Sequence, residues 1–373
     1  MSIIKYPAVR DEIRKDIEER RYKPNERIPS DDKLVARFGV SRMTIIHAIH
    51  DLEDLGYLRR KAGSGTYVCA TLPSPSSLQY NRIFGILMPD LGEAEIFEPV
   101  TTGITRAGEL MHHRMLWGPE AAQCRDAEQK AEDLCHYFIG KVSGVFFAPL
   151  EHTPNQEEVN RRIAAAFAEA NIPIVLVDRC FARYPDRSKY DLVGIDNIRA
   201  GFRMTRHLVE AGCRRVVFAS RPGAAATVDA RCAGYREALW RSHMEPQPPF
   251  LLDVGDHQTG EVRRFIDAVK PDGIVCANDF TAARLMQDIL TLGIKIPEQI
   301  KMVGINDVKY AAFLPVPLTT LRQPCKELGA AAMKAMLERL RDRKAPARDI
   351  LLDCELVVRQ SCGTEPNSET ASG

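Results

Sequence analysis

The sequence predicts an α/β protein in which a small helical module precedes a larger, doubly wound α/β domain. Within the first 70 residues, apolar side chains recur at helical spacing. From about residue 83 to about residue 340, short apolar runs alternate with amphipathic stretches of about 12–18 residues, which is typical of strands and helices in turn. These two patterns divide the chain into two parts.

Prolines and serines mark the boundary between the parts. Residues 71–81 contain Pro73, Pro75 and several serines, so we predict a linker there. The first domain is expected to cover residues 1–70 and the second residues 82–358. Residues 359–373 are expected to form a C-terminal tail.

Composition excludes several classes of protein. The chain has 373 residues, of which 45% are hydrophobic and 27% charged, so it can bury a sizeable core. No apolar run approaches the ~18 residues of a membrane span, and the first ten residues lack the apolar core of a signal peptide. We therefore expect a cytoplasmic protein without a membrane partner. The ten cysteines are scattered singly, as expected for reduced packing residues.

The charge balance leaves room for a local basic module. The net charge is only +1, but residues 1–70 hold 14 Lys and Arg against 11 Asp and Glu, or +3. A uniformly basic nucleic-acid coat is excluded, and any basic surface is expected at the N-terminus.

Three helices are predicted in the first domain. Val9, Ile13 and Ile17 recur at i+4 along the first helix. Ser30 can cap a second helix over residues 31–38, which ends at Gly39. Ser41 can cap a third helix, whose apolar positions are Ile45, Ala48, Ile49 and Leu52 and whose opposite face carries Arg42, Met43, Thr44, His47 and His50. Two helices joined by a tight turn have the shape that enters a major groove.

A two-stranded hairpin is predicted after the third helix. Arg59, Arg60 and Lys61 lead to Gly63-Ser64-Gly65, and the β-prone residues 66–68 follow. Small residues at the tip let backbone N–H groups approach phosphate, and the arginines attract the DNA backbone. The hairpin therefore is expected to act as a wing.

Residues 28–34, 38–44 and 63–68 together resemble the GntR-type winged helix-turn-helix, and the match covers nearly all of residues 5–69. The resemblance implies that double-stranded operator DNA is the partner. Asp32 and Ile46 stand where the family often has arginine, so the operator is expected to differ, and Ile46 could contact a thymine methyl. The predicted DNA-binding set is Ser41, Arg42, Thr44, Ile46, His47, Arg60 and Gly65. The alternative is a small helical domain that binds protein.

Six apolar runs predict the strands of the second domain. They are residues 83–88, 144–147, 173–177, 216–219, 273–276 and 302–305. Such runs are buried on both faces, so we expect a parallel, doubly wound arrangement with ligands at the carboxyl ends of the strands. Polar residues follow several of these ends, namely Asp90, Asp178-Arg179, Asn278-Asp279 and Asn306-Asp307.

Several ordered motifs between about residue 82 and residue 358 resemble the effector domain of LacI/GalR regulators and their periplasmic sugar-binding relatives. The motifs are residues 173–179, Asp196-Asn197, Arg231 with Gly234-Tyr235, residues 271–279, Val303-Gly304-Ile305 and residues 317–324. The resemblance implies a periplasmic-binding-protein-like fold of two lobes, joined by three crossovers near residues 192–198, 320–324 and 350. It places a sugar in the cleft between the lobes.

The resemblance also implies an effector-binding set, which is Phe97, Asp178, Arg179, Arg231, Asn278, Asn306 and Gln323. Phe97 would stack on the sugar ring, and the polar groups would bond its hydroxyls. Three alternatives stay open: Asp178 and Arg179 could form a salt bridge at the hinge, Asn278 could only cap a helix, and Phe97 could belong to the core. Asn306 and Ala94 depart from the family pattern and leave the identity of the ligand open.

No enzyme motif is present. The chain has no G-x-G-x-x-G after the first strand, no P-loop, no H-E-x-x-H and no G-x-S-x-G. We therefore expect no catalytic residues, no cofactor and no metal. The sequence predicts a homodimeric, sugar-responsive transcriptional regulator. Its order of domains resembles that of the arabinose repressors of Gram-positive bacteria, which implies that it acts as a repressor. The alternative is a sugar-binding protein without regulatory DNA binding.

Overall fold

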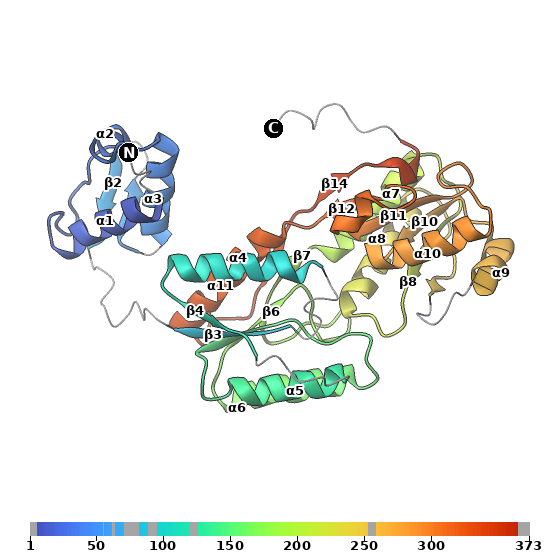
Figure 1. The fold of residues 1–373 in the computed structure, drawn as a ribbon, viewed down its shortest axis with the longest axis horizontal. Helices are drawn as coiled ribbons and strands as arrows, with labels where there is room; N and C mark the ends of the chain where they lie inside the picture. Colours follow the sequence, from blue (N-terminus) through green and yellow to red (C-terminus); the bar gives the residue numbers. More distant parts are fainter. Residues whose placement is uncertain are drawn as a thin grey trace. The chain divides into compact units, whose positions relative to one another are not determined.

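The computed structural model describes residues 6–54, 56–61, 64–70, 82–88, 95–118, 126–252 and 259–364. The chain divides into two compact units (Figure 1). The first comprises residues 1–82 with 110–112, and the second comprises residues 83–109 and 113–373. No helix among the described residues is long and apolar enough to cross a membrane.

The first unit contains three helices and a hairpin, as the sequence predicts. The elements are α1 (Tyr6–Glu18), α2 (Asp31–Phe38), α3 (Arg42–Asp54), β1 (Leu58–Lys61) and β2 (Gly65–Val68). Val9, Ile13 and Ile17 of α1 share one buried cluster with the apolar face of α3. Gly39 ends α2 with φ +64°, and its N–H donates to the carbonyl of Val35. This left-handed conformation suits glycine and turns the chain towards α3.

The first lobe of the second unit is built on a six-stranded sheet in the order β13-β7-β6-β5-β3-β4, and all its pairs are parallel. Its strands are β3 (Ile83–Leu87), β4 (Arg114–Leu116), β5 (Gly144–Phe147), β6 (Ile174–Val177), β7 (Asp191–Ile195) and β13 (Asp349–Leu352). Its helices are α4 (Phe97–Leu110), α5 (Ala127–Phe138), α6 (Gln156–Glu169) and α11 (Cys325–Arg341). Clusters of buried side chains place α4 and α11 on one face and α5 and α6 on the other.

The second lobe repeats this plan with the order β14-β12-β11-β10-β8-β9. Its strands are β8 (Val216–Ser220), β9 (Phe250–Leu251), β10 (Gly273–Cys276), β11 (Lys301–Asn306), β12 (Thr319–Arg322) and β14 (Glu355–Val357). Its helices are α7 (Asn197–Glu210), α8 (Ala226–Arg241), α9 (Thr259–Val269) and α10 (Asp279–Thr291). Only the β12–β14 pair among these described strands is antiparallel. The six predicted strands are therefore confirmed, and they fall into two sheets.

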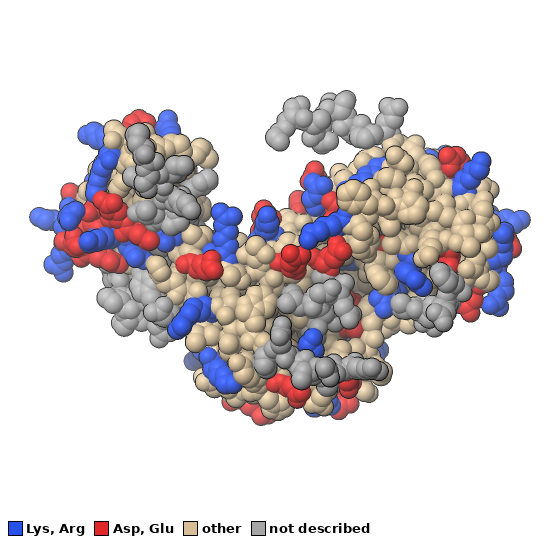
Figure 2. All heavy atoms as spheres, viewed as in Figure 1, with Lys and Arg blue, Asp and Glu red and all other residues tan. Residues whose placement is uncertain are grey.

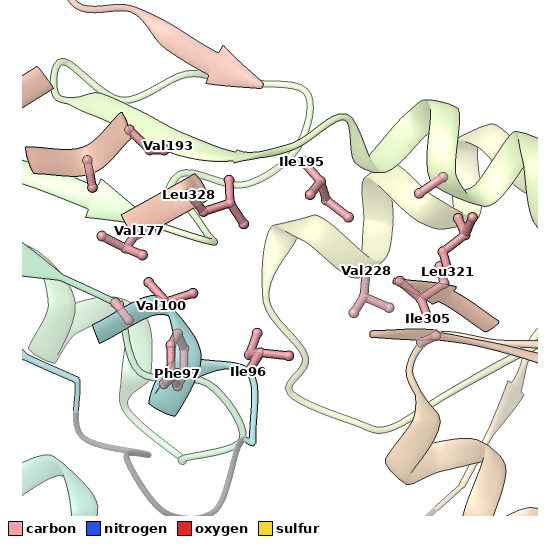
Figure 3. Close-up of a cluster of buried hydrophobic side chains, with 14 of the residues drawn as sticks. Ile96, Phe97, Val100, Val177, Val193, Ile195, Val228, Ile305, Leu321 and Leu328 are labelled. Atoms are coloured by element: carbon pink, nitrogen blue, oxygen red, sulfur yellow. The ribbon is translucent and has the colours of Figure 1, made fainter. Parts of the chain in front are cut away.

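One apolar cluster extends through both lobes and joins the inner helices of each. Ile96 and Phe97 at the start of α4 share it with Val228 of α8 and Ile305 of β11 (Figure 3). On β8, Val216 and Phe218 belong to this cluster, whereas Val217 and Ala219 belong to the cluster beneath α9 and α10. This alternation is the pleat of a strand that is covered on both faces.

Three connections pass between the lobes, close to the positions that the family resemblance implies. The chain crosses from β7 to α7 at residues 195–197, from β12 to α11 at 322–325, and from β13 to β14 at 352–355. Arg199 after the first crossover pairs with Asp353 in the third at 2.7 Å, and Arg203 donates to the carbonyl of Cys354. The crossovers are therefore tied to each other by polar contacts.

The C-terminal boundary differs from the sequence prediction. The expected tail begins at residue 359, but Arg359 pairs with Asp307, and Ser361 and Cys362 are fully buried. The Ser361 hydroxyl donates to the carbonyl of Met302 at 2.6 Å and accepts from the N–H of Thr319 at 2.9 Å. These bonds join the segment to β11 and β12, so residues 359–364 belong to the second lobe. The later part of the predicted tail lies outside the described residues.

Glycines allow two pairs of helices to cross closely beside the crossovers. A Cβ at Gly201 of α7 would collide with the carbonyl oxygen of Arg231 on α8, and one at Gly234 would collide with that of Ile198. Gly103 of α4 and Gly329 of α11 form the corresponding crossing in the first lobe. Because these obstacles are backbone atoms, they cannot turn aside as a side chain could.

Gly201→Ala should destabilise the second unit, because the added methyl group must push α7 and α8 apart. Overpacking of this kind costs about 1–3 kcal/mol or more. Gly260→Ala is the matched control, since a Cβ at Gly260 of α9 meets no atom within 4 Å. Denaturant unfolding should separate the two variants, and equal stability for both would contradict the proposed role of the crossing.

Candidate functional site

The exposed face of α3 carries most of the residues predicted to contact DNA. Ser41 and Arg42 are exposed, and Thr44 and Ile46 are half-buried. The Ser41 hydroxyl accepts from the Thr44 N–H at 3.2 Å and lies 2.8 Å from the Thr44 hydroxyl, so Ser41 caps α3 as predicted. The predicted apolar positions Ile45, Ala48, Ile49 and Leu52 are all buried. The side chain of His47 lies outside the described atoms.

The cap predicted for α2 is not formed by a side chain. Ser30 occupies the N-cap position with φ −63° and ψ 158°, but its hydroxyl makes no capping hydrogen bond. Asp31 and Asp32 in the first turn still suit the positive end of the helix. The prediction that the Ser30 side chain caps α2 is therefore wrong, whereas the predicted start of the helix is confirmed.

The hairpin predicted as a wing is present. β1 and β2 pair antiparallel with Arg60 opposite Thr66 and Lys61 opposite Gly65. Gly65 has φ +116°, a conformation that favours glycine, and a Cβ there would meet the Arg27 side chain. Gly63 at the predicted tip lies outside the described residues.

Basic side chains of the wing region are held by local partners. The Arg60 guanidinium lies 3.5 Å from the Asp31 carboxylate, and Arg59 donates to the Asn25 side chain at 2.8 Å. Arg27, which the sequence analysis did not single out, pairs with Tyr67 as an isolated β-bridge. Figure 2 shows basic and acidic side chains interspersed on the visible face of this unit, in keeping with its modest net charge.

Asp178 and Arg231 belong to opposite lobes and interact electrostatically. Asp178 directly follows β6, and Arg231 lies on α8; they are 7% and 4% exposed. Arg231 donates from Nε to Asn197 at 2.8 Å and from Nη1 to the carbonyl of Ala277 at 2.6 Å. Asn197 opens α7 at the first crossover, so it fixes Arg231 beside the hinge. Sequence reasoning noted Asn197 within a motif but did not assign it this role.

The Asp178 carboxylate is costly to ionise in this position. Burial raises the pKa of Asp178 to about 6, and the nearby Arg231 charge opposes that shift only in part. Burial likewise lowers the pKa of Arg231, while Asp178 opposes the shift. The Oδ1 atom of Asp178 is buried and has no hydrogen-bond partner among the described residues. Asp178 also has φ +69°, a strained conformation of the kind found at functional sites.

Arg179 and Phe97 pack on each other. The Arg179 guanidinium carbon lies 5.1 Å from the centre of the Phe97 ring, and Arg179 forms an ion pair with Glu151. Phe97 is 0% exposed and belongs to the core cluster (Figure 3). In this conformation the ring therefore has no face open to a sugar. Phe97 therefore occupies a buried core position, as in the alternative, and its stacking on a sugar stays a prediction.

Asn278 begins α10 as its N-cap. Its side-chain oxygen accepts from the Thr281 N–H and hydroxyl, each at 2.9 Å. Asp279, the next residue, is fully buried, accepts from Thr320 at 2.6 Å and from the Val308 N–H at 3.0 Å, and has a pKa that burial raises to about 6. The sequence indicated that Asn278 and Asp279 follow the end of β10, but it did not predict that Asp279 would bond Thr320 and Val308.

Asn306 and Gln323 bond directly. The Gln323 amide donates to the Asn306 side-chain oxygen at 2.8 Å, and both residues line an open groove at the second crossover. Asn306 and Asp307 both have positive φ, at 131° and 54°. Asp307 holds this turn by pairing with Arg322 at 2.7 Å and Arg359 at 2.6 Å. Neither Asp178 nor Arg231 lines this groove. The predicted effector residues Asn306 and Gln323 therefore line a groove that those two residues do not share.

A metal site is not formed by the part of the chain that the structure describes. No group of three or more His, Cys, Asp or Glu side chains is placed to hold an ion among those residues. Asp90 and Ala94, which the sequence analysis weighed beside the ligand residues, lie outside the described residues.

Asp178→Asn should stabilise the ligand-free protein at pH 7 by roughly 2–3 kcal/mol, at about 1.4 kcal/mol per pKa unit. A raised pKa in the folded state gives stability that is present below pH 4 and lost as pH rises through about 6. The advantage of the variant should therefore vanish near pH 4. Denaturant unfolding from pH 4 to pH 7 measures this, with the exposed Asp186→Asn as control. A gain that is independent of pH would contradict the assignment.

Comparison with known families supports both units separately. Residues 5–68 match the bacterial regulatory proteins of the gntR family. Residues 205–362 match the periplasmic binding protein-like domain.

One relative aligns with nearly the whole chain, and two solved structures align with most of it. The arabinose metabolism transcriptional repressor of Geobacillus stearothermophilus is 28% identical over 370 residues, which cover 96% of this chain and 97% of the relative. A CelR–cellobiose complex aligns with 90% of this chain and all of its own chain, with a TM-score of 0.63 and 21% identity. A LacI family regulator from Enterococcus faecalis with bound ribose aligns with 75% of this chain and 98% of its own, with a TM-score of 0.60 and 22% identity.

The two solved structures support the fold of the second unit, and the full-length relative supports the combination of domains. The chain therefore joins a DNA-binding domain of the gntR family of bacterial regulatory proteins to a periplasmic-binding-protein-like domain, which makes it a transcriptional regulator.

Proposed function

We propose that the protein is a homodimeric repressor that releases or retains operator DNA according to a sugar or related polyol bound between its lobes. The observation that carries the proposal is the buried pair of Asp178 and Arg231 at the junction of the lobes, with the Asp178 Oδ1 atom lacking a hydrogen-bond partner among the described residues. A ligand hydroxyl is a donor of the kind that this oxygen lacks.

The surrounding groups fit a polyol. A polyol offers donors and acceptors together, so its binder needs carboxylate, guanidinium and amide groups. Asp178 and Arg231 supply the first two, and Asn278, Asn306 and Gln323 supply amides at neighbouring strand ends. Arg179, which directly follows Asp178 in the chain, supplies a second guanidinium group. The names of the relatives, which refer to arabinose, cellobiose and ribose, agree with a sugar as the class of ligand.

The DNA contacts in this proposal come from α3 and the wing. Arg42 is exposed at the start of α3 and suits a guanine edge, and Ser41 and Thr44 suit phosphates or base edges. Ile46 would contact a thymine methyl, His47 lies on the same helix, and Arg60 and Gly65 would approach the backbone from the wing. A protein with operator DNA as its partner would act in the cytoplasm.

A homodimer is included because closed two-fold symmetry is the commonest arrangement of soluble oligomers and suits a helix-turn-helix protein that reads two half-sites. Two-fold symmetry of the dimer would be mirrored in a near-palindromic operator.

The regulatory mechanism follows from differential binding. A ligand that bonds Asp178 in one lobe and Arg231 in the other binds only when both lobes are in place, so it favours the closed arrangement. DNA affinity then changes by the difference in ligand affinity between the two arrangements.

Arg42→Ala should weaken binding to a selected operator by about ten- to a hundredfold, because a specific base contact is worth about 1–3 kcal/mol. The operator is the duplex that the protein enriches from a random-sequence pool. Fluorescence anisotropy gives the affinity and, at stoichiometric concentration, the number of chains per duplex, which is expected to be two. Lys15→Ala, an exposed cation of α1, is the control. Sequence-independent binding, or one chain per duplex, would contradict the corresponding part of the proposal.

A sugar should raise the thermal stability of the protein, since a ligand at a hundredfold excess over Kd stabilises the folded state by roughly 2.7 kcal/mol. The panel contains pentoses, hexoses, uronic acids and sugar phosphates. Arg231→Ala should abolish the shift, and Arg231→Lys serves if the first variant fails to fold. The absence of a shift with every compound would reject sugars as effectors while leaving the DNA-binding assignment intact.

A further inference from the structure

The loop after β5 in the first lobe contacts the loop before α8 in the second. The His152 N–H donates to the carbonyl of Gly223 at 2.8 Å, and the His152 ring Nδ1 lies 2.9 Å from the carbonyl oxygen of Pro222. Glu151 Oε2 accepts from the Ala225 N–H at 3.1 Å. Two adjacent residues of one lobe therefore bond three residues of the other.

The Glu151 contact supplies a cap that α8 cannot form for itself. Ala225 occupies the N-cap position of α8 with φ −67° and ψ 161°, and the residue three positions later, Val228, has no side-chain acceptor that could reach back to the Ala225 N–H. The first N–H groups of a helix lack partners within the helix and carry a partial positive charge. The Glu151 carboxylate from the opposite lobe accepts from the N-cap N–H, as the N3 side chain of a capping box would, and places a negative charge at this end of the helix.

Glu151 also binds Arg179 within its own lobe. The two side chains form an ion pair, with Arg179 2% exposed and Glu151 20% exposed at the side chain. His152 Nε2 lies 3.6 Å from the same carboxylate. The carboxylate thus connects Arg179, which lies next to Asp178, to the helix that carries Arg231 six residues after its cap.

We propose that Glu151 is the positioning residue that couples closure of the lobes to the ligand site. The inference rests on the proposed function in one respect, namely that the cleft between the lobes binds the effector. Separation of the lobes removes the Glu151 contact from α8 and leaves the carboxylate with Arg179 and His152 of its own lobe, so the contact favours the closed arrangement. A ligand that needs closure then binds a state that is already populated.

This role differs from that of a surface carboxylate. Glu158 lies seven residues further on and also forms an arginine pair, with Arg162 at 2.6 Å, but it is 66% exposed and both partners belong to α6. Exposed pairs of this kind contribute little to stability. Glu158→Gln is therefore the matched control for substitutions at Glu151.

Hydrogen–deuterium exchange of the full-length, ligand-free protein tests the proposal. In Glu151→Ala, the peptide containing Ala225 and the first turn of α8 should exchange about tenfold faster, as expected for the loss of a hydrogen bond to a charged group. Glu151→Gln keeps an acceptor for the Ala225 N–H but loses the charge, so it should restore part of the protection. Glu158→Gln should match the wild type. Unchanged exchange at this peptide in both Glu151 variants, with the fold intact, would overturn the proposal.

A second experiment, the titration of sugars, tests whether the Glu151 contact affects ligand affinity. L-arabinose, D-ribose and cellobiose are titrated against the wild type and Glu151→Gln by calorimetry. If one binds, the variant should bind it more weakly by about threefold to tenfold, and equal affinity would overturn the coupling. If none binds the wild type, the choice of sugar ligand fails, whereas the exchange result still decides whether Glu151 secures the lobes. Should Glu151→Ala not fold, Glu151→Gln carries both measurements.

Discussion

The second unit depends on keeping two opposite charges out of water at the junction of its lobes. Asp178 and Arg231 belong to different lobes. Burial raises the pKa of Asp178 and lowers the pKa of Arg231, so it disfavours the charged form of each. Removing a charge from water is costly unless hydrogen bonds and an opposite charge compensate. Arg231 has such compensation from Asn197 and Ala277, whereas Asp178 has it only in part. The asymmetry leaves one lobe short of a donor at the point where the lobes meet.

The same junction explains why backbone geometry there is so constrained. Arg231 keeps its position because α8 crosses α7 closely at Gly201, and Asn197 at the start of α7 bonds its guanidinium. The third crossover is tied to α7 through Arg199 and Asp353. Movement between the lobes must therefore disturb polar contacts and helix crossings together. Such a junction has few arrangements of similar energy, which is what a switch between two states requires.

Sequence patterns predicted the strands and the exposed face of α3, because burial imposes a period on the chain. The positions of the crossovers came from the family resemblance. Sequence patterns were less able to predict which polar residues meet. Phe97 follows the same helical pattern whether it faces a ligand or Arg179, and only packing decides between them. Glu151 gave no signal, since its partners are 28 and 74 residues away in the chain. The C-terminal boundary was placed too early because Ser361 and Cys362 are polar or small residues whose burial comes from bonds to β11 and β12.

The protonation of Asp178 relates the ligand site to its own energetics. Above about pH 6 the carboxylate is ionised in the folded protein at a free-energy cost, and a hydroxyl donor bonded to Oδ1 would recover part of it. Ligand binding and ionisation of Asp178 should then favour each other, so that binding releases a proton when the pH lies near or below the pKa. A carboxylate that lacks a hydrogen-bond donor in the empty site and gains one from the ligand recovers on binding part of the free energy that its burial costs. This link makes the cost of burying Asp178 part of the response rather than a defect of the fold.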